Sequence, residues 1–87
     1  MLLVVDFSDL DLDFSQADIR LSDTPDFTVG KLLGKLCDGI EELGGIPIPN
    51  RVALSLLGSN RSPLDFARKV KDISLDDWDT IYVTKRR

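Results

Sequence analysis

Residues 69–84, KVKDISLDDWDTIYVT, are the part of this chain that indicates its fold most clearly. The stretch begins with three closely spaced apolar residues, Val70, Ile73 and Leu75. An acidic turn follows, and the stretch ends in a strand whose apolar residues recur at every second position. That alternation places Thr80, Tyr82 and Thr84 on the outer side of the strand. This order of apolar segment, acidic turn and strand predicts that the last strand completes the sheet. The residues expected in the hydrophobic core are Val70, Ile73, Leu75, Ile81 and Val83.

Two strands are predicted in the first quarter of the chain. Apolar side chains alternate over residues 3–7, with further apolar residues on the second face, which indicates a strand inside a sheet. Residues 9–14 also alternate, but one position out of phase, so a bulge or turn near Ser8 must reset the pattern. The return arm of the hairpin follows a turn between Ser8 and Gln16; its inward residues are Ala17, Ile19 and Leu21, and it ends at Ser22-Asp23-Thr24-Pro25.

One amphipathic helix follows. Thr28 is the predicted N-cap, and Gly44-Gly45 ends the helix through the positive φ that glycine allows. Burying its apolar stripe, at roughly 1.5 to 3 kcal/mol for each side chain, supplies much of the hydrophobic stabilisation. The stripe consists of Val29, Leu32, Leu33, Leu36, Ile40 and Leu43.

The remaining elements complete a recognisable order. Two prolines make residues 46–50 an extended connector, and residues 51–57 alternate as a strand, with Val52, Leu54 and Leu56 toward the core. A turn at residues 58–60 and a short strand at residues 64–68 precede the last strand. The order predicts an α+β fold, a ubiquitin-like β-grasp with a mixed four- to five-stranded sheet packed on one helix. A less regular α+β sandwich stays open.

Composition limits the class of protein. Eighty-seven residues with 43% hydrophobic and 30% charged side chains predict one small globular domain over residues 1–87. The apolar start meets Asp6 too soon to be a signal peptide, and no window predicts a transmembrane segment. Cys37 is the single cysteine, so an internal disulfide is excluded and the reducing cytoplasm is the expected location.

Charge is divided unevenly along the chain. The net charge is −4, and the acidic residues gather in the first half, which argues against a nucleic-acid partner because phosphate binding depends on clustered Lys and Arg. The second half is basic. If its strands cluster, a basic face for an acidic protein surface or anionic lipid is one interpretation and solvated charge the other; its members would be Arg51, Arg61, Arg68, Lys69, Lys71 and Lys85-Arg86-Arg87.

Two stretches carry a family resemblance: residues 17–22, ADIRLS, followed by a helix, and residues 71–83, KDISLDDWDTIYV. With its length, the chain resembles the small ubiquitin-like proteins of bacterial type VII secretion loci, the YukD/EsaB family. The resemblance implies a cytoplasmic accessory or regulatory protein without catalytic activity or cofactor. Its implied partner is a component of a membrane secretion machine, which would bring it to the inner face of the membrane. One departure is Trp78, which stands where the family tends to have glycine.

Conjugation of the ubiquitin type is not expected. It requires a terminal Gly-Gly that can be adenylated and can enter narrow clefts, whereas this sequence ends TKRR. The outward positions that match the ubiquitin recognition patch are Ala53, Tyr82 and Thr84, a less aliphatic set that ordinary ubiquitin receptors should not bind. A ubiquitin-like small subunit of a multicomponent oxygenase stays open as an alternative, as does self-association of the chain.

Three features are candidate interaction sites. Gly30 and Gly34, with Cys37 on the same flank, predict a smooth strip that packs on the sheet or accepts a partner helix. Trp78 either caps the core or anchors a partner, with Tyr82 extending that surface. Arg51 and Arg68 belong to the possible basic face described above.

The acidic clusters are not predicted to be catalytic or metal sites. An EF-hand loop that began at Asp9-x-Asp11-x-Asp13 would need glycine and glutamate where Phe14 and Arg20 stand, so a solvated strand face is the preferred interpretation. The chain has no histidine, and nothing in the pattern of Asp72, Asp76, Asp77 and Asp79 separates their pKa values for acid–base chemistry. The sequence predicts a protein that is not an enzyme.

Overall fold

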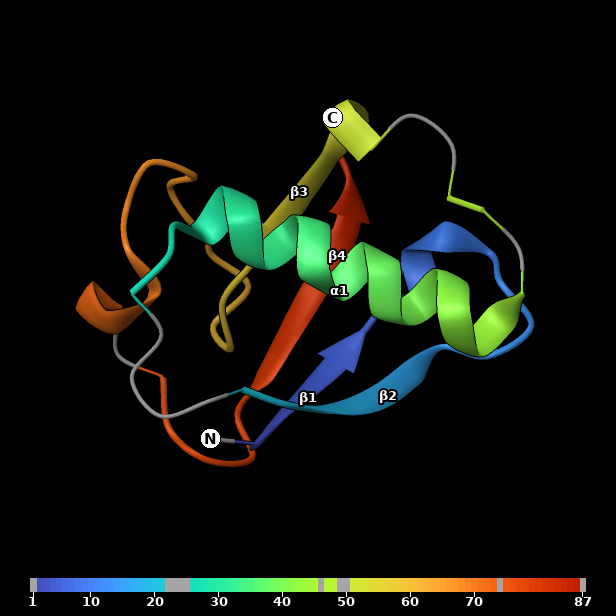
Figure 1. Ribbon diagram of the computed structural model, residues 1–87, viewed down its shortest axis with the longest axis horizontal. Coiled ribbons are helices and arrows are strands. Elements are labelled where there is room, and N and C mark those ends of the chain that lie inside the picture. The colour runs from blue at the N-terminus through green and yellow to red at the C-terminus, as the bar shows by residue number, and fades with distance from the viewer. Residues whose placement is uncertain (1, 22–25, 46, 49–50, 74, 87) are drawn as a thin grey trace.

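The computed structural model describes residues 2–21, 26–45, 47–48, 51–73 and 75–86. Within them, one helix lies across one face of a mixed sheet (Figure 1). Short 3-10 turns cover residues 8–10, 51–53 and 70–72. The regular elements are β1 (Leu2–Asp6), β2 (Gln16–Arg20), α1 (Val29–Gly44), β3 (Leu54–Leu57) and β4 (Thr80–Lys85).

The sheet has the strand order β2-β1-β4-β3. β1 pairs antiparallel with β2 and parallel with β4, and β3 pairs antiparallel with β4. The first and last strands of the described chain are therefore neighbours at the centre of the sheet, as residues 3–7 and 69–84 predict. The described part of the sheet has four strands, the lower number of the predicted range.

The core fills the layer between the sheet and α1. Phe7, at the end of β1, is fully buried and meets the Phe14 ring edge to face at 5.3 Å between centroids. From the strands, the predicted inward residues Leu3, Val5, Leu54, Leu56, Ile81 and Val83 are buried, as are Val29, Leu32, Leu33, Leu36, Cys37 and Ile40 of α1.

Both predicted ends of the helix are confirmed. The Thr28 hydroxyl accepts a hydrogen bond from the Lys31 N–H at 3.3 Å, and Gly45 ends the helix at φ 67°. The prediction for Leu43 is wrong, because its side chain is 63% exposed. The last turn of α1 lies over the loop before β2, where a Cβ on Gly44 would be 3.3 Å from the Phe14 ring, and Leu43 lies beyond the core.

Two predicted strand segments are not strands. The turn between Ser8 and Gln16 is confirmed, but residues 9–14 form a 3-10 turn and an irregular loop, because the Asp6 carboxylate accepts hydrogen bonds from the Ser8 N–H and hydroxyl. Residues 64–68 bend away because the Asp65 carboxylate accepts the Ala67 N–H at 2.9 Å. The Asp9, Asp11 and Asp13 carboxylates thus belong to a loop and not to a strand face.

Val52 corrects a further prediction. It is 81% exposed, because residues 51–53 form a 3-10 turn and β3 starts only at Leu54. The predicted strand ending at residues 22–25 and the predicted connector at residues 46–50 fall wholly or largely outside the described residues. In the described residues, no helical segment has both the length and the apolar character that crossing a bilayer requires.

Candidate protein-binding surface

The sheet leaves one face uncovered by α1, here called the open face. On β1 its residues are Leu2, Val4 and Asp6, and the strand registers place Arg20, Thr80 and Tyr82 beside them. All the outward residues of β1, β3 and β4 are half-buried, because each packs against its neighbours on the pleated surface. The open face comprises Leu2, Val4, Asp6, Gln16, Asp18, Arg20, Ser55, Leu57, Thr80, Tyr82 and Thr84.

A groove of about 600 Å³ lies on the β3 and β4 side of the open face. The predicted residues Tyr82 and Thr84 line it, and the Arg61 guanidinium stacks 4.5 Å from the centre of the Tyr82 ring. Asp6 lies in the same groove, and the hydrogen bond from the Ser8 N–H is the main cause that lowers the pKa of its carboxyl. The sequence indicated only that Arg61 is one of the basic residues. It did not predict the contact with Tyr82, because no residue pattern around Arg61 indicates which aromatic ring its guanidinium covers.

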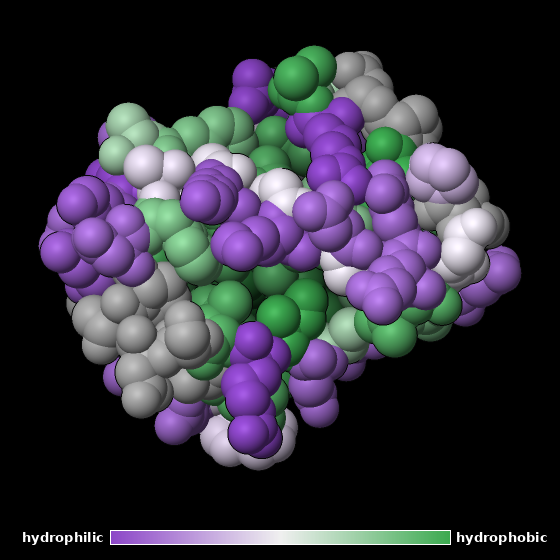
Figure 2. All heavy atoms as spheres, in the orientation of Figure 1, coloured by the Kyte–Doolittle hydropathy of each residue, from purple (hydrophilic) through white to green (hydrophobic). Residues whose placement is uncertain are grey.

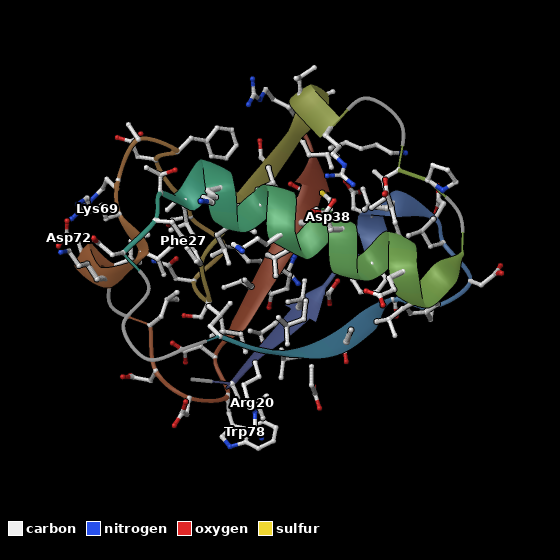
Figure 3. All side chains as sticks on the ribbon, viewed as in Figure 1. Arg20, Phe27, Asp38, Lys69, Asp72 and Trp78 are labelled. Carbon is white, nitrogen blue, oxygen red and sulfur yellow. The ribbon has the colours of Figure 1, made fainter. Side chains whose placement is uncertain are left out.

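Trp78 lies at the opposite end of the sheet, next to the start of β1. Its side chain is 64% exposed, which excludes the first of the two interpretations, that it caps the core. Its backbone is left-handed, at φ 70°, and its N–H donates to the Leu2 carbonyl at 2.7 Å. Arg20 pairs with Leu2 from the other side, and Figure 3 shows the Arg20 and Trp78 side chains beside each other. We call Leu2, Arg20 and Trp78 the tryptophan surface.

The acidic turn around Trp78 uses its carboxylates to hold the backbone. The Asp77 carboxylate accepts the Leu2 N–H at 3.0 Å, and the Asp79 carboxylate accepts the Asp76 N–H at 2.9 Å. Two further backbone bonds, from Trp78 N–H to Leu2 and from Val4 N–H to Asp79, join the same turn to β1. The Trp78 backbone is therefore fixed from both sides while its indole stays in solvent.

The smooth strip predicted from Gly30, Gly34 and Cys37 is not a continuous surface in the structure. A Cβ on Gly30 would be 3.5 Å from the Phe66 carbonyl oxygen, so this glycine packs closely against residues after β3. Gly34 has open space around its Cα, but the Arg51 guanidinium donates to its carbonyl at 3.4 Å. Cys37 is buried, and burial raises the pKa of its thiol.

The predicted basic face is also divided. Arg51 pairs with two carboxylates of α1, while Lys69 and Lys71 both pair with Asp26. Arg68 donates to the Asp72 carbonyl at 3.2 Å. Figure 3 shows Lys69 and Asp72 at one extremity of the molecule, far from Arg20 and Trp78. Ala53 is separate again: it sits in the 3-10 turn before β3, and its carbonyl accepts the Arg86 N–H at 2.6 Å.

Acid is expected to destabilise the protein partly because it weakens the ion pair between Glu41 and Arg51. The guanidinium contacts Glu41 at 2.7 Å and Asp38 at 2.8 Å, and its hydrogen bond is the main cause that lowers the pKa of Glu41. A carboxylate whose pKa is lower in the folded state stabilises that state above its unfolded pKa of ~4.3, and the contribution is lost as the pH falls through the folded value. The urea concentration at the midpoint of unfolding should therefore decrease as the pH is lowered from 6 to ~2.5.

Replacing the guanidinium isolates this contribution. Arg51→Gln should lower the urea midpoint at pH 6, and the difference from the wild type should shrink as the pH is lowered, because protonation of Glu41 removes its ion pair with Arg51. The Lys31→Gln variant removes an exposed charge elsewhere on α1 and is the control. An Arg51→Gln deficit of the same size at both pH values would mean that packing, not the ion pair, is what Arg51 contributes.

Comparison with known proteins identifies the fold. No family profile and no curated protein sequence matches the chain. The ubiquitin of Caldiarchaeum subterraneum superimposes with a TM-score of 0.68 and 16% identity, covering 100% of this chain and 94% of that one. The fold is the ubiquitin-like β-grasp. A second match is the crystal structure of ATBAG1 in complex with HSP70, with a TM-score of 0.66 and 13% identity over 99% of this chain and 40% of that one.

Proposed function

We propose that this ubiquitin-like domain acts without catalysis, by binding another protein through the tryptophan surface. The observation that carries the proposal is Trp78, a large aromatic side chain left 64% exposed on a backbone at φ 70°. Left-handed backbone costs a non-glycine residue on the order of 1 kcal/mol, and such strain is retained mainly where it serves a function. Exposed tryptophans are frequent anchors of protein interfaces.

The chemistry of the side chains supports a role without catalysis. The Cys37 thiol is buried and its pKa is raised, which keeps it protonated and makes it a poor nucleophile. The sequence contains no histidine. Asp77 and Asp79 accept hydrogen bonds from backbone N–H groups, so these carboxylates have a structural task in the turn.

We further propose bacterial type VII secretion as the setting, with the protein in the cytoplasm, at the inner face of the membrane when bound. The support is the resemblance of residues 17–22 and 71–83 to the YukD/EsaB family, in which an accessory or regulatory role is implied. ATBAG1, part of which has this fold, was crystallised in complex with HSP70, so the fold occurs in a protein that forms such a complex.

Affinity capture from the native host tests both parts of the proposal. Tagged wild-type protein should recover a membrane component of a secretion machine, and folded Trp78→Ala should recover at least ~10-fold less, as expected for the loss of an interface anchor. Lys31→Ala, on the exposed side of α1, is the matched control and should behave as the wild type. Recovery of a di-iron hydroxylase would favour the oxygenase alternative, and equal recovery with Trp78→Ala would remove Trp78 from the interface.

A further inference from the structure

The edge of the sheet at β2 has no strand beside it among the described residues. The strand order β2-β1-β4-β3 leaves two edges, and at the other one residues 63 and 64 cover the second half of β3 through a bridge to Leu57 and a hydrogen bond to the Leu56 carbonyl. An uncovered edge presents backbone groups that can pair with another strand. β2 is therefore the edge with the longer uncovered run of backbone among the described residues.

The register shows which backbone groups of β2 point outward. The Phe7 N–H donates to the Ser15 carbonyl at 2.8 Å, so Phe7 and Ser15 form a hydrogen-bonded pair at the end of the β1–β2 ladder. Hydrogen-bonded pairs alternate along an antiparallel ladder, so Ala17 and Ile19 also bond to β1. The N–H and C=O groups of the residues between them, Gln16, Asp18 and Arg20, point away from the sheet.

The side chains of β2 are complementary to their own copy in one register. Asp18 and Arg20 are both exposed on the open face, and no ion pair or side-chain hydrogen bond joins either to another described residue. Antiparallel pairing of two β2 strands about Asp18 would set like charges directly opposite. Pairing about Ile19 instead sets Asp18 opposite Arg20 of the second copy, twice, through the outward backbone groups.

We propose that two copies of this protein associate through β2, with a two-fold axis at Ile19, and so join their sheets into one. The register forms about four backbone hydrogen bonds and two Asp18–Arg20 ion pairs on the open face. The two Ile19 residues form a non-hydrogen-bonded pair, in which Cα atoms approach to ~4.5 Å and side chains make close contact.

An apolar surface lies beside this edge on the helix side. Ile19 is half-buried, and its side chain lies 3.8 Å from the position of a Cβ on Gly39 of α1. The exposed Leu43 follows one helical turn later. Figure 2 shows an apolar hollow between the charged outer side of α1 and the polar side chains along β2. Ile19 of a second copy would lie against this surface.

Association is expected to be weak. Each β2 contributes five residues, and two such strands bury less than the ~1,200 Å² of a stable interface, so a Kd on the order of 100 µM is expected. Sedimentation equilibrium up to ~1 mM should show a monomer–dimer equilibrium. A wild-type protein that stays monomeric at that concentration would overturn the proposal.

Charge exchange tests the register. Asp18→Arg and Arg20→Asp should each remove dimerisation, since each sets like charges opposite one another twice. An equimolar mixture of the two variants should form a heterodimer, and the double variant should self-associate as the wild type does. Asp72→Arg makes the same charge change away from β2 and is the control. Dimers of unchanged strength in either single variant, or no complex in the mixture, would place the interface elsewhere.

Amide exchange of the wild type gives a second test that needs no variant. As concentration rises, the N–H groups of Asp18 and Arg20 should gain protection, while those of Ala17 and Ile19, already bonded to β1, should change little. Protection that appears instead on α1 or β3 would contradict pairing through β2.

Discussion

Replacing Trp78 with glycine is expected to stabilise the fold and weaken partner binding at the same time. Glycine adopts φ 70° without a Cβ clash, which should raise the free energy of unfolding by about 0.5–1 kcal/mol and the melting temperature by a few degrees. Loss of the indole should weaken binding by ~2 kcal/mol or more, about 30-fold in Kd. Thermal unfolding and titration of the captured partner measure the two effects.

A second residue with the same backbone conformation provides the control. Asp11 is left-handed at φ 55°, and its exposed carboxylate makes an ion pair with Lys85 at 4.0 Å. Asp11→Gly should relieve less backbone strain than Trp78→Gly, because aspartate tolerates left-handed backbone better than tryptophan does, and it should leave partner binding unchanged. If Trp78→Gly bound the partner as well as the wild type does, the strained backbone at Trp78 would have no role in binding. If Trp78→Gly were less stable than the wild type, the indole would have to pack on the domain.

Phe7→Ala is expected to have the largest effect on stability. Phe7 is fully buried at the end of the central strand and packs edge to face on Phe14. Truncating a buried phenylalanine costs about 3–5 kcal/mol, against a total of ~4–13 kcal/mol for a domain of this size. The melting temperature should fall by at least ~12 °C, with much of the protein unfolded at 37 °C.

Val52→Ala is the control for the core, because alternation from Arg51 to Leu57 predicted an inward Val52 and the structure exposes it. Its free energy of unfolding should change by less than ~0.5 kcal/mol. A deficit at Val52 comparable to that of Leu54→Ala, which empties a buried position, would mean that residues 51–53 continue the strand into the core after all.

Hydrophobic periodicity predicted the parts of the fold that depend on burial. The alternation of Leu3, Val5 and Phe7 and the apolar stripe on α1 placed both layers of the core, because the residues of each pattern share one side of their element. Residues 9–14 and 64–68 also alternate, yet they turn, because Asp6 and Asp65 bind nearby backbone N–H groups. Such local hydrogen bonds compete with strand pairing and leave no mark in the apolar pattern.

The candidate site was only partly predictable. Alternation placed Tyr82 and Thr84 outward correctly, and the departure from glycine at Trp78 was the one local sign of its left-handed backbone. The sequence did not predict which of the remaining candidate residues lie together, because their positions depend on contacts with residues far away in the sequence. Gly30 meets Phe66, and Arg51 meets two carboxylates on α1, so neither contributes to the tryptophan surface.

The most direct test of the binding role is an NMR titration of isotope-labelled protein with the partner recovered by affinity capture. Resonances of the Leu2 and Arg20 amides and the Trp78 indole N–H are predicted to shift together as partner is added, while those of the outer side of α1 stay in place. Shifts confined to Lys31, Lys35 and Asp38 on that helix, with the indole unmoved, would contradict a binding surface at Trp78.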